Sequence, residues 1–310
     1  NIEFVEFWLL NPYLNTDGSG TPNPNAEDGR MDGTIYFELG NVSEDVLRDR
    51  RKFFENGLPG PNTQGKRVLN TDWGRVPVSR QITTAFDIDP DNRVAQDVGF
   101  DGIADSLERI EYADYLNQIS TISNTDVINS IRADPSNDNY VSFRDPQYPD
   151  NTPVFERYSR FFGTEGNSPV QQGSLPTGSS TLPDTEDLDR DNSLNELESY
   201  FQYPVPIKYD GVGGIDTDNN QYIIDQISST DGSRTWYRFK IPLDVPNVKK
   251  VGEIENFRSI RFIRMYMKEF EAKMNFRFAT LDLVRNQWRR YQTPEDLSEV
   301  NCGFTEPNAS

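Results

Sequence analysis

The stretch Asp187–Glu198, DLDRDNSLNELE, has the spacing of a twelve-residue calcium-binding loop. Ca²⁺ takes about six to eight oxygens, and alternate residues of a curling loop direct their oxygens to one point. Asn192 stands at the tight turn in place of the usual glycine, and asparagine tolerates the left-handed conformation. The predicted calcium ligands are Asp187, Asp189, Asp191, the Ser193 carbonyl, Asn195 and Glu198. The alternative is a solvated acidic loop.

A second loop, DPSNDNYVSFRD over Asp134–Asp145, repeats this frame. An aspartate closes it where the first loop has a glutamate, and the shorter side chain predicts weaker binding or a water-mediated contact. Its predicted ligands are Asp134, Ser136, Asp138, the Tyr140 carbonyl, Ser142 and Asp145.

A third loop, DVGFDGIADSLE over Asp97–Glu108, matches less completely because Gly99 leaves its third position without a ligand. Its predicted ligands are Asp97, Asp101, the Ile103 carbonyl, Asp105 and Glu108. We expect the nearby carboxylates of Asp87, Asp89 and Asp91 to complete this site. The three loops are unequally spaced, which argues against a paired EF-hand domain.

Charge and composition limit the classes of function. The 310 residues include 31 Lys and Arg against 50 Asp and Glu, a net charge of −19. Such a surface repels phosphate backbones and anionic lipid, and it suits divalent cations or basic partners. The chain has no His, which excludes Ser-His and Cys-His catalysis and His zinc ligands. Its single cysteine, Cys302, allows no internal disulfide.

The order of apolar patterns predicts strands at both ends of the chain with an acidic helical region between them. Strands are expected over 2–10, 34–39, 221–227, 234–243, 259–270 and 275–288, and helices over 43–57, 103–110, 124–131 and 154–162. Residues 59–80 are expected to form a loop, and 171–185 an exposed linker. No apolar run reaches the roughly 18 residues of a membrane helix.

These patterns predict a mainly β fold with α insertions. We expect a jelly-roll-like β-sandwich that carries a large helix-and-loop insertion with EF-hand-like calcium loops. Residues 1–80 and 201–310 would form the sandwich, and residues 81–200 the insertion. Two separate domains are the alternative. The first residue is Asn, which suggests a mature protein or a piece of a longer chain.

Several long strings resemble the SprA/Sov family, the outer-membrane translocon of the Bacteroidetes type IX secretion system. They run nearly from end to end of the chain and include VEFWLLNPYL, RRKFFENGLP, RVAQDVGFDGIADSLE, FERYSRFFGTEGNSPV, LPDTEDLDRDNSLNELESYFQYPV and RFIRMYMKEFEAKMNFRFATLDLVRNQWRRY. The resemblance implies part of a much longer protein whose barrel forms a protein-conducting pore. It supplies no catalytic residues, which agrees with the missing catalytic motifs.

The resemblance also implies a location and partners. We expect a non-enzymatic insertion that does not span the membrane, at the extracellular face of the outer membrane, capping or shaping the pore exit. The expected partners are the rest of the barrel, a partner barrel protein, a plug protein and cargo with C-terminal signals, in secretion and gliding motility. The rival is a calcium-containing carbohydrate-binding module that uses Trp8, Trp73, Trp236 and Trp288. A glycoside hydrolase with paired carboxylates is a third class.

Overall fold

The computed structural model describes residues 2–15, 20–52, 55–79, 85–122, 124–161, 182–183, 185–231, 233–246 and 248–285. The strands are β1 (Phe4–Leu10), β2 (Gly33–Asn41), β3 (Val68–Thr71), β4 (Gly74–Pro77), β5 (Ser199–Ile207), β6 (Ile223–Ser228), β7 (Thr235–Pro242), β8 (Lys249–Val251), β9 (Phe262–Lys268) and β10 (Phe278–Val284). The α-helices are α1 (Pro90–Gln96), α2 (Asp105–Glu111), α3 (Ala113–Ile119), α4 (Thr125–Ala133) and α5 (Val154–Arg157). Trp288, Cys302 and most of the expected linker lie outside the described residues.

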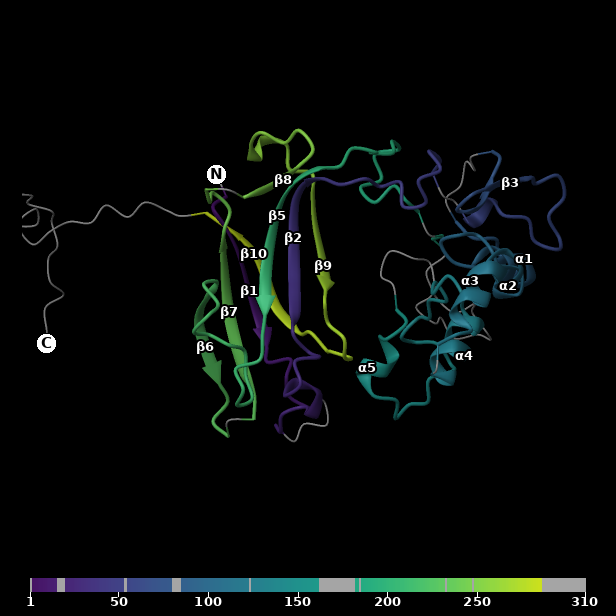
Figure 1. Ribbon diagram of the computed structural model, residues 1–310. Helices are drawn as coiled ribbons and strands as arrows, with labels where there is room; N and C mark the ends of the chain where they lie inside the picture. Colours follow the sequence, from purple (N-terminus) through teal and green to yellow (C-terminus); the bar gives the residue numbers. More distant parts are fainter. Residues whose placement is uncertain are drawn as a thin grey trace, which may run out of the picture. The chain divides into compact units, whose positions relative to one another are not determined.

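Most of the strands form two four-stranded sheets (Figure 1). One has the order β10-β1-β7-β6 and the other β8-β5-β2-β9, while β3 and β4 form a separate two-stranded sheet. Strand β1 pairs antiparallel with both β10 and β7, so Phe7 lies opposite Leu281 on one side and Phe239 on the other. Strands from the two ends of the chain therefore share one sheet.

Alternation along the strands builds the core. Val5, Phe7 and Leu9 of β1 are fully buried, whereas the residues between them belong to the other face. The Phe7 ring stacks on Phe239 with centroids 4.8 Å apart, and it lies 5.3 Å from Phe37 of the second sheet. The two sheets thus face each other across aromatic contacts. The prediction of a mainly β fold is confirmed.

The described part of the segment 43–57 is not the helix that the sequence predicts. It contains bends and a short 3₁₀ helix over Glu55–Gly57, and Arg48 and Arg50 have positive φ. The Asp45 carboxylate accepts hydrogen bonds from the backbone amides of Asp49 and Arg50. These amides are then not available for the backbone hydrogen bonds of a helix, which explains why the predicted helix does not form there.

The chain divides into two compact units. The first comprises Asn1–Phe37, Gln202–Lys249 and Met265–Ser310, and the second Glu38–Phe201 and Lys250–Arg264. The helices α1 to α5 and the three predicted calcium loops all belong to the second unit. Within the described residues, no helix has the length and apolar character needed to cross a membrane.

Candidate metal centre

The loop Asp187–Glu198 has the tight turn that its sequence predicts. Asn192 adopts a left-handed conformation with φ +66°, and Arg190 has φ +58°. Asp189 accepts a hydrogen bond from the Asp191 amide at 3.1 Å. The Ser193 hydroxyl and amide both donate to Asp191, and these bonds lower the pKa of the exposed Asp191 carboxyl. Two of the predicted ligands therefore stabilise the turn itself.

Asp187 is the buried member of this loop. Its Oδ2 atom lies 2.7 Å from the Lys52 ammonium and also accepts the Asn192 amide at 3.0 Å. Its Oδ1 atom is buried without a hydrogen-bond partner in the described part of the chain. A lysine therefore already compensates the charge of the residue that begins the predicted loop.

Glu44 is a member of this site that the sequence analysis did not identify. It is buried, and it accepts hydrogen bonds from the backbone amides of Leu188 at 2.9 Å and Asn195 at 3.1 Å. Oxygens of Glu44, Asp187 and Asp189 lie within 4.8 Å of one another. In the sequence, Glu44 is one of two acids after Ser43, which is a helix-start pattern and gives no signal of a contact with a loop about 140 residues away.

Glu198 and Asn195 have other partners. Glu198 accepts hydrogen bonds from Arg264 and from the Ser43 amide. The Asn195 side chain donates to the Val42 carbonyl and accepts the Leu197 amide. Among the described residues, Glu198 does not belong to the acidic group around Asp187.

The second and third predicted loops meet at one point. Asp101 and Glu108 come from the loop 97–108, and Asp138 comes from the loop 134–145. All three residues are buried, and one carboxylate oxygen from each lies within 4.8 Å of the others. The sequence presents these residues as parts of two sites, whereas the structure brings them together in one.

Hydrogen bonds hold these three carboxylates in place. Asp101 accepts from the Ile103 amide at 2.9 Å and from the Tyr112 hydroxyl at 2.9 Å. The Ser136 amide donates to Glu108 Oε2 at 3.2 Å, and the Ser136 hydroxyl donates to Asp138 Oδ1 at 2.6 Å. Glu108 Oε1 is buried and has no hydrogen-bond partner among the described residues.

Burial makes these groups weaker acids than usual. Burial and then the neighbouring Asp138 carboxylate raise the pKa of Asp101 to about 7. Burial also raises the pKa of Glu108 to about 7, and it raises the pKa of Asp138. A nearby cation would reverse these shifts, because it favours the ionised form of each carboxylate.

The other predicted ligands lie elsewhere or have structural contacts. Asp134 pairs with Arg160 at 3.1 Å, and Asp97 pairs with Arg93 at 3.6 Å. Asp89 caps the N-terminus of α1, Asp91 lies in its first turn, and Asp87 accepts the Asp89 amide. The remaining ones are Asp105 at the start of α2, Ile103 and Ser142, which are buried, Tyr140, whose ring contacts Phe100, and Asp145, which accepts the Gln147 amide.

A third acidic group consists of Asp45, Asp49 and Glu186, none of which the sequence analysis singled out. Asp49 Oδ2 is buried without a hydrogen-bond partner among the described residues. Burial, together with the nearby Asp45 carboxylate, raises the pKa of Asp49. Asp45 and Asp49 lie just after Glu44 in the sequence, and Glu186 lies just before Asp187. The segments 44–49 and 186–189 therefore each contribute residues to two acidic groups.

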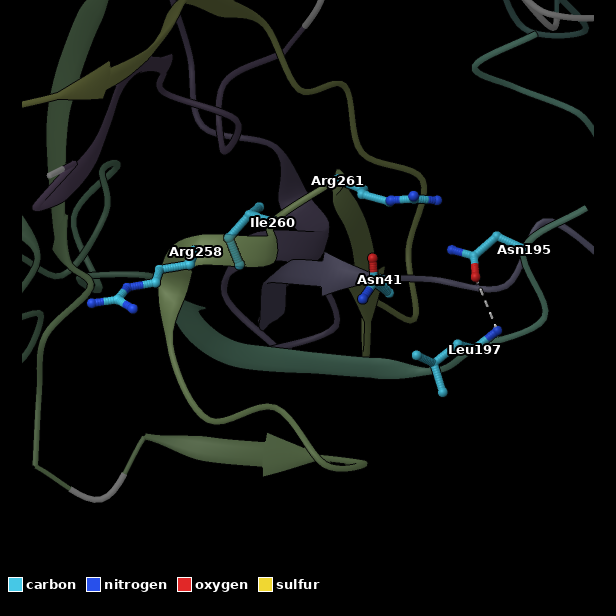
Figure 2. A pocket seen from close by; sticks show the side chains of 6 residues that line it. All are labelled: Asn41, Asn195, Leu197, Arg258, Ile260 and Arg261. Carbon is cyan, nitrogen blue, oxygen red and sulfur yellow. Dashed lines mark hydrogen bonds between the residues drawn. The ribbon is translucent and has the colours of Figure 1, made fainter. Parts of the chain in front are cut away.

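A pocket of about 550 Å³ lies in the same unit. It is lined by Asn41, Asn195, Leu197, Arg258, Ile260 and Arg261. Figure 2 shows that the side chains of Arg258 and Arg261 point in opposite directions. The two guanidinium groups therefore do not form a clamp for one carboxylate or phosphate, and the pocket does not have the convergent polar groups of a specific ligand site.

The fold and the acidic groups define a mainly β protein that carries clustered, buried carboxylates. Residues 114–305 match the family model SprA_N, described as a motility related/secretion protein. This match covers more than half of the chain, so the chain belongs to that family. A search of curated proteins finds no match. The resemblance noted from the sequence is thereby confirmed, and a role related to secretion and motility follows from it.

Proposed function

We propose that this chain is a non-catalytic, calcium-stabilised extracellular domain of the type IX protein secretion translocon. In this proposal it caps or shapes the pore exit at the outer membrane and contacts cargo or partner proteins. The observation that carries the proposal is the family match, which spans the loops 134–145 and 187–198 and strands β5 to β10. Both structural units are thus represented in a family of secretion and motility proteins.

The calcium part of the proposal rests on the buried acidic groups. Carboxylates are almost never buried unless they are paired or bind a metal. The groups around Asp187, Asp49 and Glu108 each contain a buried carboxylate oxygen without a hydrogen-bond partner among the described residues. Ca²⁺ is the natural ligand for such oxygen clusters, and it would stabilise the folded chain by binding it in preference to the unfolded chain.

The tryptophans give the carbohydrate-binding alternative no support. Trp8 and Trp236 are half-buried on β1 and β7. Trp73 is 51% exposed in the turn between β3 and β4. Of the tryptophans that the structure describes, only Trp73 is well exposed, whereas a sugar-stacking platform needs several exposed rings.

Removal of residues 1–310 from the full-length translocon in cells tests the proposal. We expect the barrel to reach the outer membrane and retain its partner barrel protein, while secretion of a reporter with the C-terminal signal and gliding both fall. Co-purification of the partner barrel is the control for assembly. Normal secretion and gliding by an assembled barrel without these residues would reject the proposal.

A further inference from the structure

We infer that Asp101, Glu108 and Asp138 hold one divalent cation, which joins two loops that appear as separate sites in the sequence. The inference rests on the calcium part of the proposed function and identifies the residues of one site. Asp101 lies between α1 and α2, Glu108 is on α2, and Asp138 follows α4. The ion would therefore connect the two ends of the segment that contains α2, α3 and α4.

The separation of the oxygens fits a calcium ion. Calcium–oxygen bonds are about 2.3–2.6 Å long, so oxygens on opposite sides of the ion are about 4.6–5.2 Å apart. One oxygen from each carboxylate lies within 4.8 Å of the other two. The three oxygens can therefore bind the same ion without movement of the backbone. The three carboxylates can provide three to six ligand atoms, and backbone carbonyls or water can complete the coordination.

The buried Glu108 side chain supplies independent evidence for a ligand. Glu108 is 0% exposed, its Oε2 atom accepts the Ser136 amide, and its Oε1 atom has no hydrogen-bond partner in the described part of the chain. A buried carboxylate oxygen without a donor is strongly unfavourable. A cation bound by Oε1 removes that penalty.

The charge of this site also differs from that of the Asp187 group. Lys52 lies 2.7 Å from Asp187, whereas none of the ion pairs among the described residues includes Asp101, Glu108 or Asp138. In the described part of the chain these three buried carboxylates have no basic partner, so in their ionised form they need a positive charge from another source. This contrast favours the Asp101 site over the Asp187 loop as a cation site.

Gly99 gives the site its compact geometry. Its φ is +98°, and a Cβ atom at this position would lie 2.5 Å from the Asp138 carboxylate. The lack of a side chain thus allows the loop 97–108 to approach Asp138 closely. In the predicted loop 97–108, Gly99 is a position without a ligand side chain. In the structure, its lack of a side chain makes room for Asp138 from the loop 134–145.

Terbium luminescence and calcium titration test the inference. Tb³⁺ replaces Ca²⁺, and the Tyr112 hydroxyl lies 2.9 Å from an Asp101 oxygen, so this ring should sensitise Tb³⁺ emission from the site. We expect E108Q and D138N to lose one calcium site or to weaken it by more than about tenfold, since even the loss of an outer-sphere partner costs about 10–100-fold. Y112F keeps all three carboxylates, so it should still bind calcium while it loses the sensitised emission.

D187N is the matched control, because it removes a buried carboxylate from a different acidic group. It should keep the Tyr112-sensitised emission. Equal calcium stoichiometry, affinity and emission in the wild-type chain and in folded E108Q and D138N would overturn the inference. If D187N alone loses calcium, the calcium part of the proposed function stands and this site fails. If the wild-type chain binds no calcium, both fail.

Discussion

The guanidinium group of Arg264 donates hydrogen bonds to both carboxylate oxygens of Glu198, at 3.2 and 3.1 Å. The same group lies 2.6 Å from Oε2 of Glu38, which is buried on β2. One arginine on β9 thus compensates two acids. The residue that the sequence places at the last position of a calcium loop takes part in this ion network.

Replacement of Arg264 by Met should lower the free energy of unfolding by about 1–3 kcal/mol. A buried carboxylate that loses its cation costs about 3–5 kcal/mol, and the partly exposed guanidinium position lets water offset some of this. Urea denaturation at saturating calcium measures the change. The double variant R264M/E38Q should recover part of this loss of unfolding free energy. If the losses of the two single variants simply add in the double variant, the pairing of Arg264 with Glu38 is contradicted.

Replacement of Glu44 by Ala should loosen the loop 187–198 specifically. The variant removes the acceptor for the amides of Leu188 and Asn195. We expect these two amides to exchange with deuterium faster, by about tenfold for each 1.4 kcal/mol of lost local stability. S43A is the neighbouring control, since the Ser43 hydroxyl accepts the Asp45 amide and neither of the two loop amides. Equal exchange in the wild-type chain and E44A would show that Glu44 does not hold this loop.

Replacement of Gly99 by Ala should disturb the Asp138 carboxylate as well as the backbone. The new methyl group meets Asp138 at 2.5 Å, in addition to the strain of a positive φ. G65A is the control, because Gly65 has φ +77° and nothing within 4 Å of its Cβ position. We expect G65A to lose about 1–2 kcal/mol of stability from strain alone. G99A should lose more in thermal or urea unfolding, and an equal loss in both variants would remove the evidence for close packing.

The calcium-free chain should become less stable as pH rises from about 5 to 8. Burial raises the pKa values of Asp101 and Glu108 to about 7, from ordinary values of 3.8 and 4.5. Between the unfolded and folded pKa values the folded chain holds more protons than the unfolded chain, so its stability decreases with increasing pH. The unfolding midpoint in chelator measures this trend.

The double variant D101N/E108Q is the control for the pH prediction, because neither amide titrates. Its midpoint should depend less on pH than that of the wild-type chain over the same range. The comparison also cancels the contributions of the other acids. An identical dependence of the unfolding midpoint on pH in the two proteins would mean that Asp101 and Glu108 titrate as exposed carboxyl groups do.

Much of the β fold can be predicted from local patterns. Strands β1, β7 and β9 have β-branched and aromatic residues in runs that the sequence analysis identified. Strand β5 was not predicted. It contains Pro204 and Pro206, which are unusual in a central strand, although Phe201, Tyr203, Val205 and Ile207 alternate into the core. Alternation of buried residues was the stronger signal there. The β3–β4 hairpin was expected to be loop because residues 59–80 show little periodicity, and strands of four residues are too short to give a clear pattern.

The sequence predicted the individual ligand residues of the candidate site, but not that residues from two loops come together in one site. The spacing of Asp101, Glu108 and Asp138 within their loops marked each as a candidate ligand. Their meeting depends on how α2, α3 and α4 fold back, and no local pattern encodes that path. Glu44 shows the same limit, because its contact with the loop at Leu188 spans 144 residues.

The contact between Asp101 and Asp138 closes a loop of 37 residues. Without a cation, the ends of this loop carry three carboxylates that repel one another when ionised. With a cation, the same ends are cross-linked, so closure of the loop and binding of the ion become a single event. The timing of folding for α2, α3 and α4 would then depend on where the chain first meets calcium. In the proposed function, a change of compartment on the way to the outer membrane would then trigger the folding of this segment.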